Sequence, residues 1–341
     1  MKTQVNWAIV APGNIANKMA EAISASGRTD KSICAYAIAS RNIERASAFA
    51  QKWNFQKAYG SYEELFNDPN VDAVYVSNPH PFHHDVVVQA LQHGKHVLCE
   101  KPAGCNMAQL TDMLDFARRQ NLFFMEAMWS AFNPCLNAVR QRIGAGVIGD
   151  VKNIGSRFCN RFPYAPHSRF FDPDQAGGAL LDLGIYNIYF SMMMAQSTNV
   201  VKYNSLARIE KGVDMWNSVN LLFDNGITAS FQSAVNQPTV VDTHNAIIYG
   251  EKGFIFVKNF FMTEYAEVQL FTADGNEYRL AEKIDMPFDV NGYEYEMRAA
   301  TQCILRGETE SAVHPHSMSK ILCSLMDSIR ADWGLKYPFE K

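Results

Sequence analysis

The first third of the chain alternates short apolar runs with longer stretches in which apolar residues recur at helical spacing. Strands are predicted at the apolar runs, residues 5–10, 32–39, 73–77, 96–99 and 122–125. Helices are predicted between them, at about residues 15–24, 43–52, 86–93 and 107–118, and another starts at the capping-box pair Ser61 and Glu64. This alternation is typical of βαβ units, so we expect an α/β fold with a doubly wound parallel sheet over residues 1–125.

The pattern changes after about residue 126, where strand-like runs follow one another. These runs lie at residues 219–223, 227–231, 246–249, 254–257 and 268–272. The turn sequences Asp224-Asn225-Gly226 and Asp274-Gly275-Asn276 favour antiparallel hairpins between them. Helical spacing returns at residues 293–306 and 317–330. Residues 126–341 are therefore predicted to form a second, α+β domain.

Composition and charge narrow the possible classes of function. A chain of 341 residues, 48% of them hydrophobic, has room for about two domains at roughly 150 residues each. Its 31 Lys and Arg residues against 35 Asp and Glu residues give a formal charge of -4. The chain lacks the basic surface that nucleic-acid binding requires, so we expect no nucleic-acid partner.

The spacing of the cysteines and the length of the apolar segments indicate the cellular compartment. The seven cysteines are scattered without a C-x-x-C pair, which argues against a disulfide framework and against a structural zinc site. The chain does not start with an apolar signal segment, and no run approaches the ~18 apolar residues of a membrane span. We expect a cytoplasmic protein with no membrane partner.

A glycine turn follows the first predicted strand and precedes the first predicted helix. It reads Ala11-Pro12-Gly13-Asn14-Ile15-Ala16 and is similar to the dinucleotide fingerprint, in which small residues let the backbone approach a pyrophosphate at a helix N-terminus. Ala11 stands at the first glycine position, which we expect to be tolerated only if its φ stays below zero. The turn favours a nucleotide site.

Ser40 and Arg41 stand at the end of the second predicted strand. A carboxylate is common there in NAD-selective domains, whereas a hydroxyl and a guanidinium can hydrogen-bond a 2'-phosphate. This favours NADP over NAD. Alternatively, Ser40 or Asn42 only caps the next helix and Arg41 lies on a solvated face.

Two further segments leave predicted strands at the carboxyl edge of the first sheet, where doubly wound sheets bind ligands. One carries Ser77, Asn78, His80 and the adjacent histidines His83 and His84. Nothing nearby completes a ligand set for a metal, so no metal is expected. His83 and His84 could equally be residues at a helix start with no further role.

The other segment ends in Glu100-Lys101-Pro102. A lysine beside a nicotinamide could donate to a substrate oxygen and stabilise charge developing there. The alternative is a surface ion pair between Glu100 and Lys101 with little energetic consequence.

Asp182 and Tyr186 lie four residues apart at the start of a predicted helix, after Gly177-Gly178. This spacing places a carboxylate and a phenol on one helix face. A free tyrosine has a pKa near 10, so acid/base work near neutrality requires a neighbouring cation such as a lysine ammonium or an oxidised nicotinamide. Alternatively, the two residues are a solvated edge and a half-buried packing residue.

Taken together, the chain resembles the Gfo/Idh/MocA oxidoreductases. The resemblance covers almost the whole chain and rests on Gly13-Asn14-Ile15-Ala16, Ala39-Ser40-Arg41, Glu100-Lys101-Pro102, residues 125–129, 177–186, 248–253 and 292–296. Within the family it is similar to the branch of trans-dihydrodiol dehydrogenase and NADP-dependent aldose dehydrogenases, which shares Ser-Arg after the second strand, Tyr186 and the ending at residues 333–338.

The resemblance implies a Rossmann domain, a C-terminal domain with a large open, mostly antiparallel sheet, and an active site between them. Lys101 would be the catalytic lysine, Tyr186 the acid/base and Asp182 a substrate-orienting carboxylate, and the Lys101-Pro102 bond is expected to be cis. The expected cofactor-binding residues are Ala11, Gly13, Asn14, Ile15, Ser40, Arg41, Ser77, Asn78, His80, His83, Glu100 and Lys101. The expected substrate-binding residues are Lys101, Trp129, Arg169, Asp182 and Tyr186.

The chain departs from the family pattern at Ala131, where relatives commonly have an arginine. Any contact of that arginine must be lost or supplied by Arg157, Arg161 or Arg169. The leading hypothesis is an NADP-dependent dehydrogenase acting on a sugar, polyol or related diol, working as a homodimer or larger homo-oligomer. The alternatives are a non-catalytic NAD(P)-binding sensor or regulatory subunit, and an interaction scaffold without a nucleotide.

Overall fold

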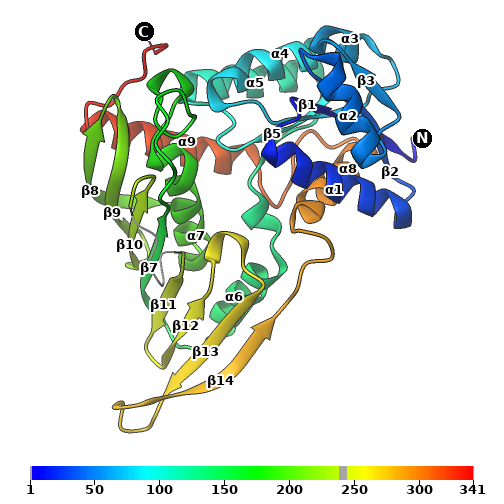
Figure 1. Cartoon of the computed structure of the whole chain (residues 1–341). Coiled ribbons are helices and arrows are strands. Elements are labelled where there is room, and N and C mark those ends of the chain that lie inside the picture. Colours follow the sequence, from blue (N-terminus) through cyan, green and yellow to red (C-terminus); the bar gives the residue numbers. More distant parts are fainter. Residues whose placement is uncertain (1, 238–243, 341) are drawn as a thin grey trace. The chain divides into compact units, whose positions relative to one another are not determined.

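The computed structural model describes residues 2–237 and 244–340 (Figure 1). Contacts divide the chain into two compact units. The first unit comprises Met1–Phe132 and Phe288–Cys323, and the second comprises Asn133–Pro287 and Ser324–Lys341. The functional division into residues 1–125 and 126–341 stays a prediction.

The first unit is built on a six-stranded parallel sheet of order β3-β2-β1-β4-β5-β6. Its strands are β1 (Val5–Val10), β2 (Ile33–Ala39), β3 (Lys57–Tyr59), β4 (Ala73–Val76), β5 (His96–Glu100) and β6 (Phe124–Ala127). Its helices are α1 (Asn14–Thr29), α2 (Ile43–Trp53), α3 (Tyr62–Asn67), α4 (His83–Gln92), α5 (Met107–Gln120) and α8 (Tyr293–Leu305). This strand order is that of the Rossmann fold, with its switch point between β1 and β4, and it confirms the predicted doubly wound sheet.

The central strands of this sheet are mostly apolar because parallel sheets are covered on both faces. Every residue of β4 is fully buried, and so are Trp7 and Ile9 on β1. Late in the chain, α8 returns to pack against α1 (Figure 1). The indole nitrogen of Trp7 donates to the hydroxyl of Thr301 on α8 at 2.9 Å, so this helix belongs to the core of the first unit.

The second unit is built on an eight-stranded sheet of order β14-β13-β12-β11-β7-β10-β9-β8. Its strands are β7 (Val151–Cys159), β8 (Val200–Glu210), β9 (Val213–Phe223), β10 (Thr228–Ala234), β11 (Ala246–Gly250), β12 (Gly253–Val257), β13 (Tyr265–Phe271) and β14 (Tyr278–Asp285). β10 runs parallel to β7, and the other neighbouring pairs are antiparallel. The predicted hairpins and the predominantly antiparallel sheet are confirmed.

Helices α6 (Pro134–Gly144) and α7 (Ile185–Ala195) cover one face of this sheet. Along β9, alternate residues from Val213 to Phe223 are buried. We call the other side the open face. It exposes an aromatic group on β11 to β14, in which Tyr249 and Tyr278 both approach Phe254, with ring centroids 6.2 and 5.0 Å away.

The last long helix, α9 (His316–Asp332), contributes to both units. No helix within the described residues is both long and apolar enough to cross a membrane.

Candidate active site

The fingerprint turn between β1 and α1 adopts an unusual backbone conformation. Ala11 has a φ of +69°, so the expectation that its φ stays below zero is wrong. The amide of Gly13 donates to the carbonyl of Ala11 at 2.8 Å, and the hydroxyl of Ser77 lies 2.9 and 3.0 Å from the carbonyl oxygens of Val10 and Ala11. These contacts offset the roughly 1–2 kcal/mol that the left-handed conformation costs an L-residue.

The start of α1 fits the pyrophosphate of a dinucleotide. Gly13 caps the helix without a side-chain hydrogen bond, and the first turn carries no acidic residue. Asn14 and Ile15 open the helix, so their region presents amides and the positive end of the helix dipole. A Cβ on Gly13 would meet open space, which leaves the backbone accessible to a ligand.

At the end of β2, the side-chain contacts distinguish helix capping from cofactor binding, the two roles considered for Ser40, Arg41 and Asn42. Asn42 caps α2, since its side chain accepts from the amide of Arg45 at 2.9 Å. The hydroxyl of Ser40 accepts from the amide of Asn42 at 3.2 Å and is largely buried. Arg41 is exposed, so capping does not occupy its guanidinium.

The loop after β4 is tied to the segment after β5 by His83. This histidine is fully buried, with Nδ1 2.9 Å from the carbonyl oxygen of Pro102 and Nε2 2.7 Å from that of Asn78. Burial lowers the pKa of His83, which favours a neutral ring. His80 packs edge-on against it at 5.7 Å. His83 therefore braces two loops, and its contact with a cofactor stays a prediction.

Glu100 and Lys101 are buried at the end of β5, each with 8% exposure. The alternative of a surface ion pair is therefore wrong. The carboxylate of Glu100 accepts from the hydroxyl of Tyr75 and from the backbone amide of Lys101. The Lys101-Pro102 peptide bond is cis, as predicted. Glu100 thus fixes the backbone from which Lys101 projects.

A buried carboxyl that the sequence analysis missed stands near this pair. Glu296 on α8 is fully buried, and neither of its carboxyl oxygens has a hydrogen-bond partner among the described residues. Burial, followed by the charge of Glu100, raises the pKa of Glu296 well above its usual range. Glu296 is therefore harder to ionise than a carboxyl in water.

Trp129, expected to contact substrate, is held by two aromatic contacts within the first unit. Its ring stacks on Tyr293 at 4.6 Å and lies 6.4 Å from Phe288. A Cβ on Gly292 would lie 3.0 Å from the indole, so the small residue permits this packing. The indole N–H is buried and has no hydrogen-bond partner among the described residues.

In the second unit, Asp214 on β9 anchors the segment that carries Asp182. This segment starts with a π-helical turn, Leu180–Gly184, and continues as α7. One carboxylate oxygen of Asp214 accepts from the amide of Leu180 and from the side-chain amide of Asn217, both at 2.8 Å. Burial raises the pKa of Asp214 to about 7, against the lowering effect of these hydrogen bonds. Sequence reasoning missed this residue, although an acid inside an apolar strand signals a buried polar group.

The glycines before this segment are required by close packing. Gly178 has a φ of +114°, and a Cβ there would lie 2.1 Å from the other carboxylate oxygen of Asp214. A Cβ on Gly177 would lie 2.9 Å from the carbonyl oxygen of Asp172. The Gly-Gly pair therefore lets the chain pass directly over Asp214 before the helix begins.

Tyr186 is fixed by its neighbour Asn187 and by aromatic packing. Asn187 is fully buried, accepts from the hydroxyl of Ser156 at 2.7 Å and donates to the hydroxyl of Ser233 at 3.1 Å. Tyr186 is 8% exposed, with the ring of Phe158 5.8 Å away. The phenol is therefore carried on a rigid helix.

Asp182 forms an ion pair with Arg169, with 3.0 Å between carboxylate oxygen and guanidinium nitrogen. The guanidinium also lies 4.3 Å from the ring centre of Phe170. Of the three arginines considered as replacements at the family's arginine position, Arg169 contacts a predicted site residue, Asp182. Arg157 lies on the open face, where it pairs in register with Gln232, and Arg161 lines a cavity.

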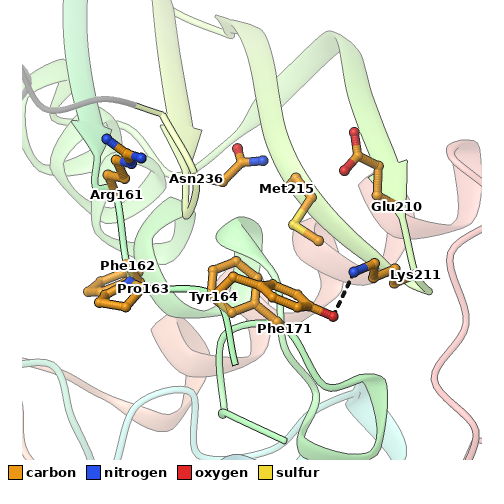
Figure 2. Close-up of a pocket in the computed structure, with 9 residues that line it drawn as sticks. All are labelled: Arg161, Phe162, Pro163, Tyr164, Phe171, Glu210, Lys211, Met215 and Asn236. Atoms are coloured by element: carbon orange, nitrogen blue, oxygen red, sulfur yellow. Dashed lines mark hydrogen bonds between the residues drawn. The ribbon is translucent and has the colours of Figure 1, made fainter. Parts of the chain in front are cut away.

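This cavity has a volume of about 440 Å³ and lies within the second unit (Figure 2). It is lined by Arg161, Phe162, Pro163, Tyr164, Phe171, Glu210, Lys211, Met215 and Asn236. The ammonium of Lys211 donates to the hydroxyl of Tyr164 at 2.6 Å. Phe162 stacks on Phe170 at 3.6 Å, so the cavity wall contacts the residue that follows Arg169 in the chain.

Two family models match successive parts of the chain. Residues 5–128 match the family described as an oxidoreductase family with an NAD-binding Rossmann fold, and residues 136–256 match the GFO/IDH/MocA C-terminal domain. The chain is similar to trans-1,2-dihydrobenzene-1,2-diol dehydrogenase from Mus musculus, at 35% identity, and from Homo sapiens, at 34% identity, over 99% of both sequences in each case.

Two solved structures show the same fold. One is KijD10, a 3-ketoreductase from Actinomadura kijaniata in complex with NADP and TDP-benzene, at 25% identity and a TM-score of 0.83 over 96% of this chain and 97% of the other. The second is levoglucosan dehydrogenase in complex with NADH and levoglucosan, at 18% identity and a TM-score of 0.83 over 97% of both chains.

Proposed function

The chain belongs to the Gfo/Idh/MocA family of oxidoreductases, and we propose that it transfers hydride between NADP and a carbinol or carbonyl carbon of a sugar, polyol or related diol. The observation that carries this proposal is buried Lys101 at the carboxyl end of β5, with its backbone held by Glu100. A lysine in this position of a dinucleotide-binding sheet has the place and charge to polarise a substrate oxygen.

NADP, when bound, supplies the hydride acceptor or donor at its nicotinamide. The start of α1 at Gly13 would hold its pyrophosphate, and Ser40 with Arg41 would hold its 2'-phosphate. The remaining proposed cofactor contacts are Ala11, Asn14, Ile15, Ser77, Asn78, His80, His83, Glu100 and Lys101.

The chain's own residues handle the proton. In oxidation, the substrate carbon loses its C–H pair as hydride, the C–O bond becomes C=O, and Tyr186 accepts the hydroxyl proton. In reduction, Tyr186 returns a proton to the new alkoxide. The ammonium of Lys101 stabilises negative charge on the same oxygen and on the phenolate. This mechanism requires Lys101 and Tyr186 to meet at one substrate oxygen, and that requirement is the central claim.

Asp182 and Arg169 serve orientation. The carboxylate of Asp182 can accept from a substrate hydroxyl while Arg169 holds it in place, which selects the carbon that reacts. We expect Trp129 to contribute apolar surface to the same molecule. A polyhydroxylated substrate is consistent with relatives named for a diol and with neighbours named for a sugar.

NADP is preferred over NAD because the end of β2 offers no carboxylate. Arg41 is exposed there, and a guanidinium pairs bidentately with a phosphate. Solved relatives were obtained with NADP in one case and with NADH in another, so the fold accommodates both cofactors. The side chains after β2 therefore decide the preference.

The open face supports a homodimer or larger homo-oligomer. Its aromatic group around Phe254 leaves Tyr278 62% and Leu280 43% exposed, and apolar patches of this kind mark association sites. All seven cysteines are free thiols, which suits a cytoplasmic location.

The test is a screen of aldoses, polyols and diols with NADP and of the matching carbonyl compounds with NADPH, followed at 340 nm. We expect an absorbance change with at least one member of the panel and a much smaller one with NAD. A protein that binds NADP but changes the absorbance with none of them would be a sensor rather than an enzyme.

A further inference from the structure

We propose that the cavity of Figure 2 is a subsite for an acidic group on the substrate, so that the preferred substrates are sugar derivatives bearing a carboxylate or phosphate. This inference rests on the proposed function and specifies its substrate class.

The size and walls of the cavity suit one ring and its substituent. Its volume of about 440 Å³ lies within the roughly 300–1,000 Å³ of small-molecule sites. Tyr164 and Phe171 form one wall, with ring centroids 5.2 Å apart, and Phe162 and Met215 add further apolar surface. Such a combination of flat apolar walls and a few polar groups is typical of a pocket that orients a ring.

The polar groups of the cavity favour an anion. Arg161 and Asn236 are partners in an antiparallel bridge, so their side chains leave the backbone on the same side (Figure 2). Within the described residues, no carboxylate lies within ion-pair distance of Arg161. A guanidinium beside an amide can hold a carboxylate or phosphate with two or more hydrogen bonds.

The other charged groups do not cancel this preference. Lys211 lies across the cavity at the turn between β8 and β9, and it donates to Tyr164 without an acidic partner among the described residues. Glu210 is already paired with Arg208, with 2.9 Å between guanidinium nitrogen and carboxylate oxygen. The cavity therefore retains two cations that no carboxylate of its own lining neutralises.

Packed side chains connect the wall of the cavity to Asp182 in the proposed reaction site. Phe162 forms part of its wall and stacks on Phe170 at 3.6 Å. The guanidinium of Arg169 lies 4.3 Å from the ring centre of Phe170 and forms an ion pair with Asp182. A substrate that reaches both Asp182 and the cavity would therefore place its hydroxyl and its acidic group on either side of this aromatic pair.

The experiment is calorimetric titration of the full chain with methyl glucuronide and with methyl glucoside, which differ in a carboxylate. Wild type should bind the glucuronide about 10- to 100-fold more tightly, the range for one charge-assisted pair. Arg161→Met should lose this preference, whereas the exposed control Arg157→Met on the open face should keep it. Equal affinities in wild type, or an unchanged preference in Arg161→Met, would overturn the proposal.

Binding measured in this way is independent of turnover. If the protein oxidises neutral and acidic sugars with equal kcat/KM and shows no Arg161-dependent binding, the subsite is wrong and the proposed function stands. If methyl glucuronide binds through Arg161 but no sugar reduces NADP, the subsite stands and the proposed function is wrong.

Discussion

Replacing Asp214 by asparagine should remove a large pH dependence from the stability of the second unit. The carboxyl is fully buried and its pKa is raised to about 7, whereas an aspartate in an unfolded chain has a pKa of about 3.9. The folded state therefore binds this proton more tightly than the unfolded state. The stabilisation from Asp214 is complete below about pH 4 and is lost as the pH rises through about 7.

The magnitude follows from the two pKa values. From about pH 5 to about pH 7 the carboxyl is ionised in the unfolded chain but protonated in the folded one, so the free energy of unfolding falls by about 1.36 kcal/mol per pH unit, or about 2.7 kcal/mol over this interval. In Asp214→Asn the amide cannot titrate, so the free energy of unfolding should lack this fall. The side chain keeps its shape and an oxygen that can accept from Leu180.

The assay is urea unfolding at several values between pH 5 and 8, with wild type and variant measured side by side. The difference in unfolding free energy should change by about 2.7 kcal/mol in favour of the variant as the pH rises. The exposed control Asp285→Asn on β14 should show no such change relative to wild type. A flat difference between wild type and Asp214→Asn would refute the claim that burial holds the proton on Asp214.

Three further predictions concern the proposed site. Tyr186→Phe should lower kcat by about 10²- to 10⁴-fold with little change in KM, because it removes only the proton carrier, and an unchanged kcat at 340 nm would exclude that role. Arg41→Glu should lower the ratio of kcat/KM for NADP over NAD at least tenfold, because the new carboxylate repels the 2'-phosphate, and an unchanged ratio would remove Arg41 from cofactor selection. Gly178→Ala should lower stability by about 2–4 kcal/mol, since its Cβ would overlap Asp214 at a φ of +114°, and a wild-type melting temperature would contradict this packing.

The hydrophobic pattern predicts most of the buried strands of both sheets and fails mainly at their edges. β1 and β4 stand in the middle of the first sheet and are apolar because helices cover both faces. β3, β8 and β14 were missed, and each lies at an edge of its sheet. β7 was also missed although it lies in the middle of the second sheet, whereas the edge strand β6 was predicted. Most residues of β14 are exposed, so its pairing with β13 leaves little apolar signal in the sequence.

Local hydrogen bonding was predicted where partners lie close in sequence. Ser61 caps α3 by accepting from the amide of Glu64 at 3.1 Å, as the capping-box spacing indicates. The carboxylate of Glu64 reaches the amide of Gly60 rather than that of Ser61. The cap therefore forms as predicted, with the reciprocal bond displaced by one residue.

The predicted site residues could be recognised from motifs, whereas their supports could not. Lys101 and Asp182 follow recognisable sequences, but Glu296 and Asp214 lie far from them along the chain and acquire their roles only through packing. Asp214 reaches the amide of Leu180 from 34 residues away. Burial of an acid is set by the tertiary fold, and a single sequence shows only that the residue is out of place in an apolar segment.

The most direct test of the central claim compares wild type with Lys101→Met in two measurements on the same preparations. NADP reduction at 340 nm, with the substrate found in the screen, should fall by at least 10²-fold in the variant. The affinity for NADP, measured by calorimetry, should remain within about twofold of wild type. Full turnover by Lys101→Met would contradict the proposal that its ammonium and the phenol of Tyr186 act on one substrate oxygen.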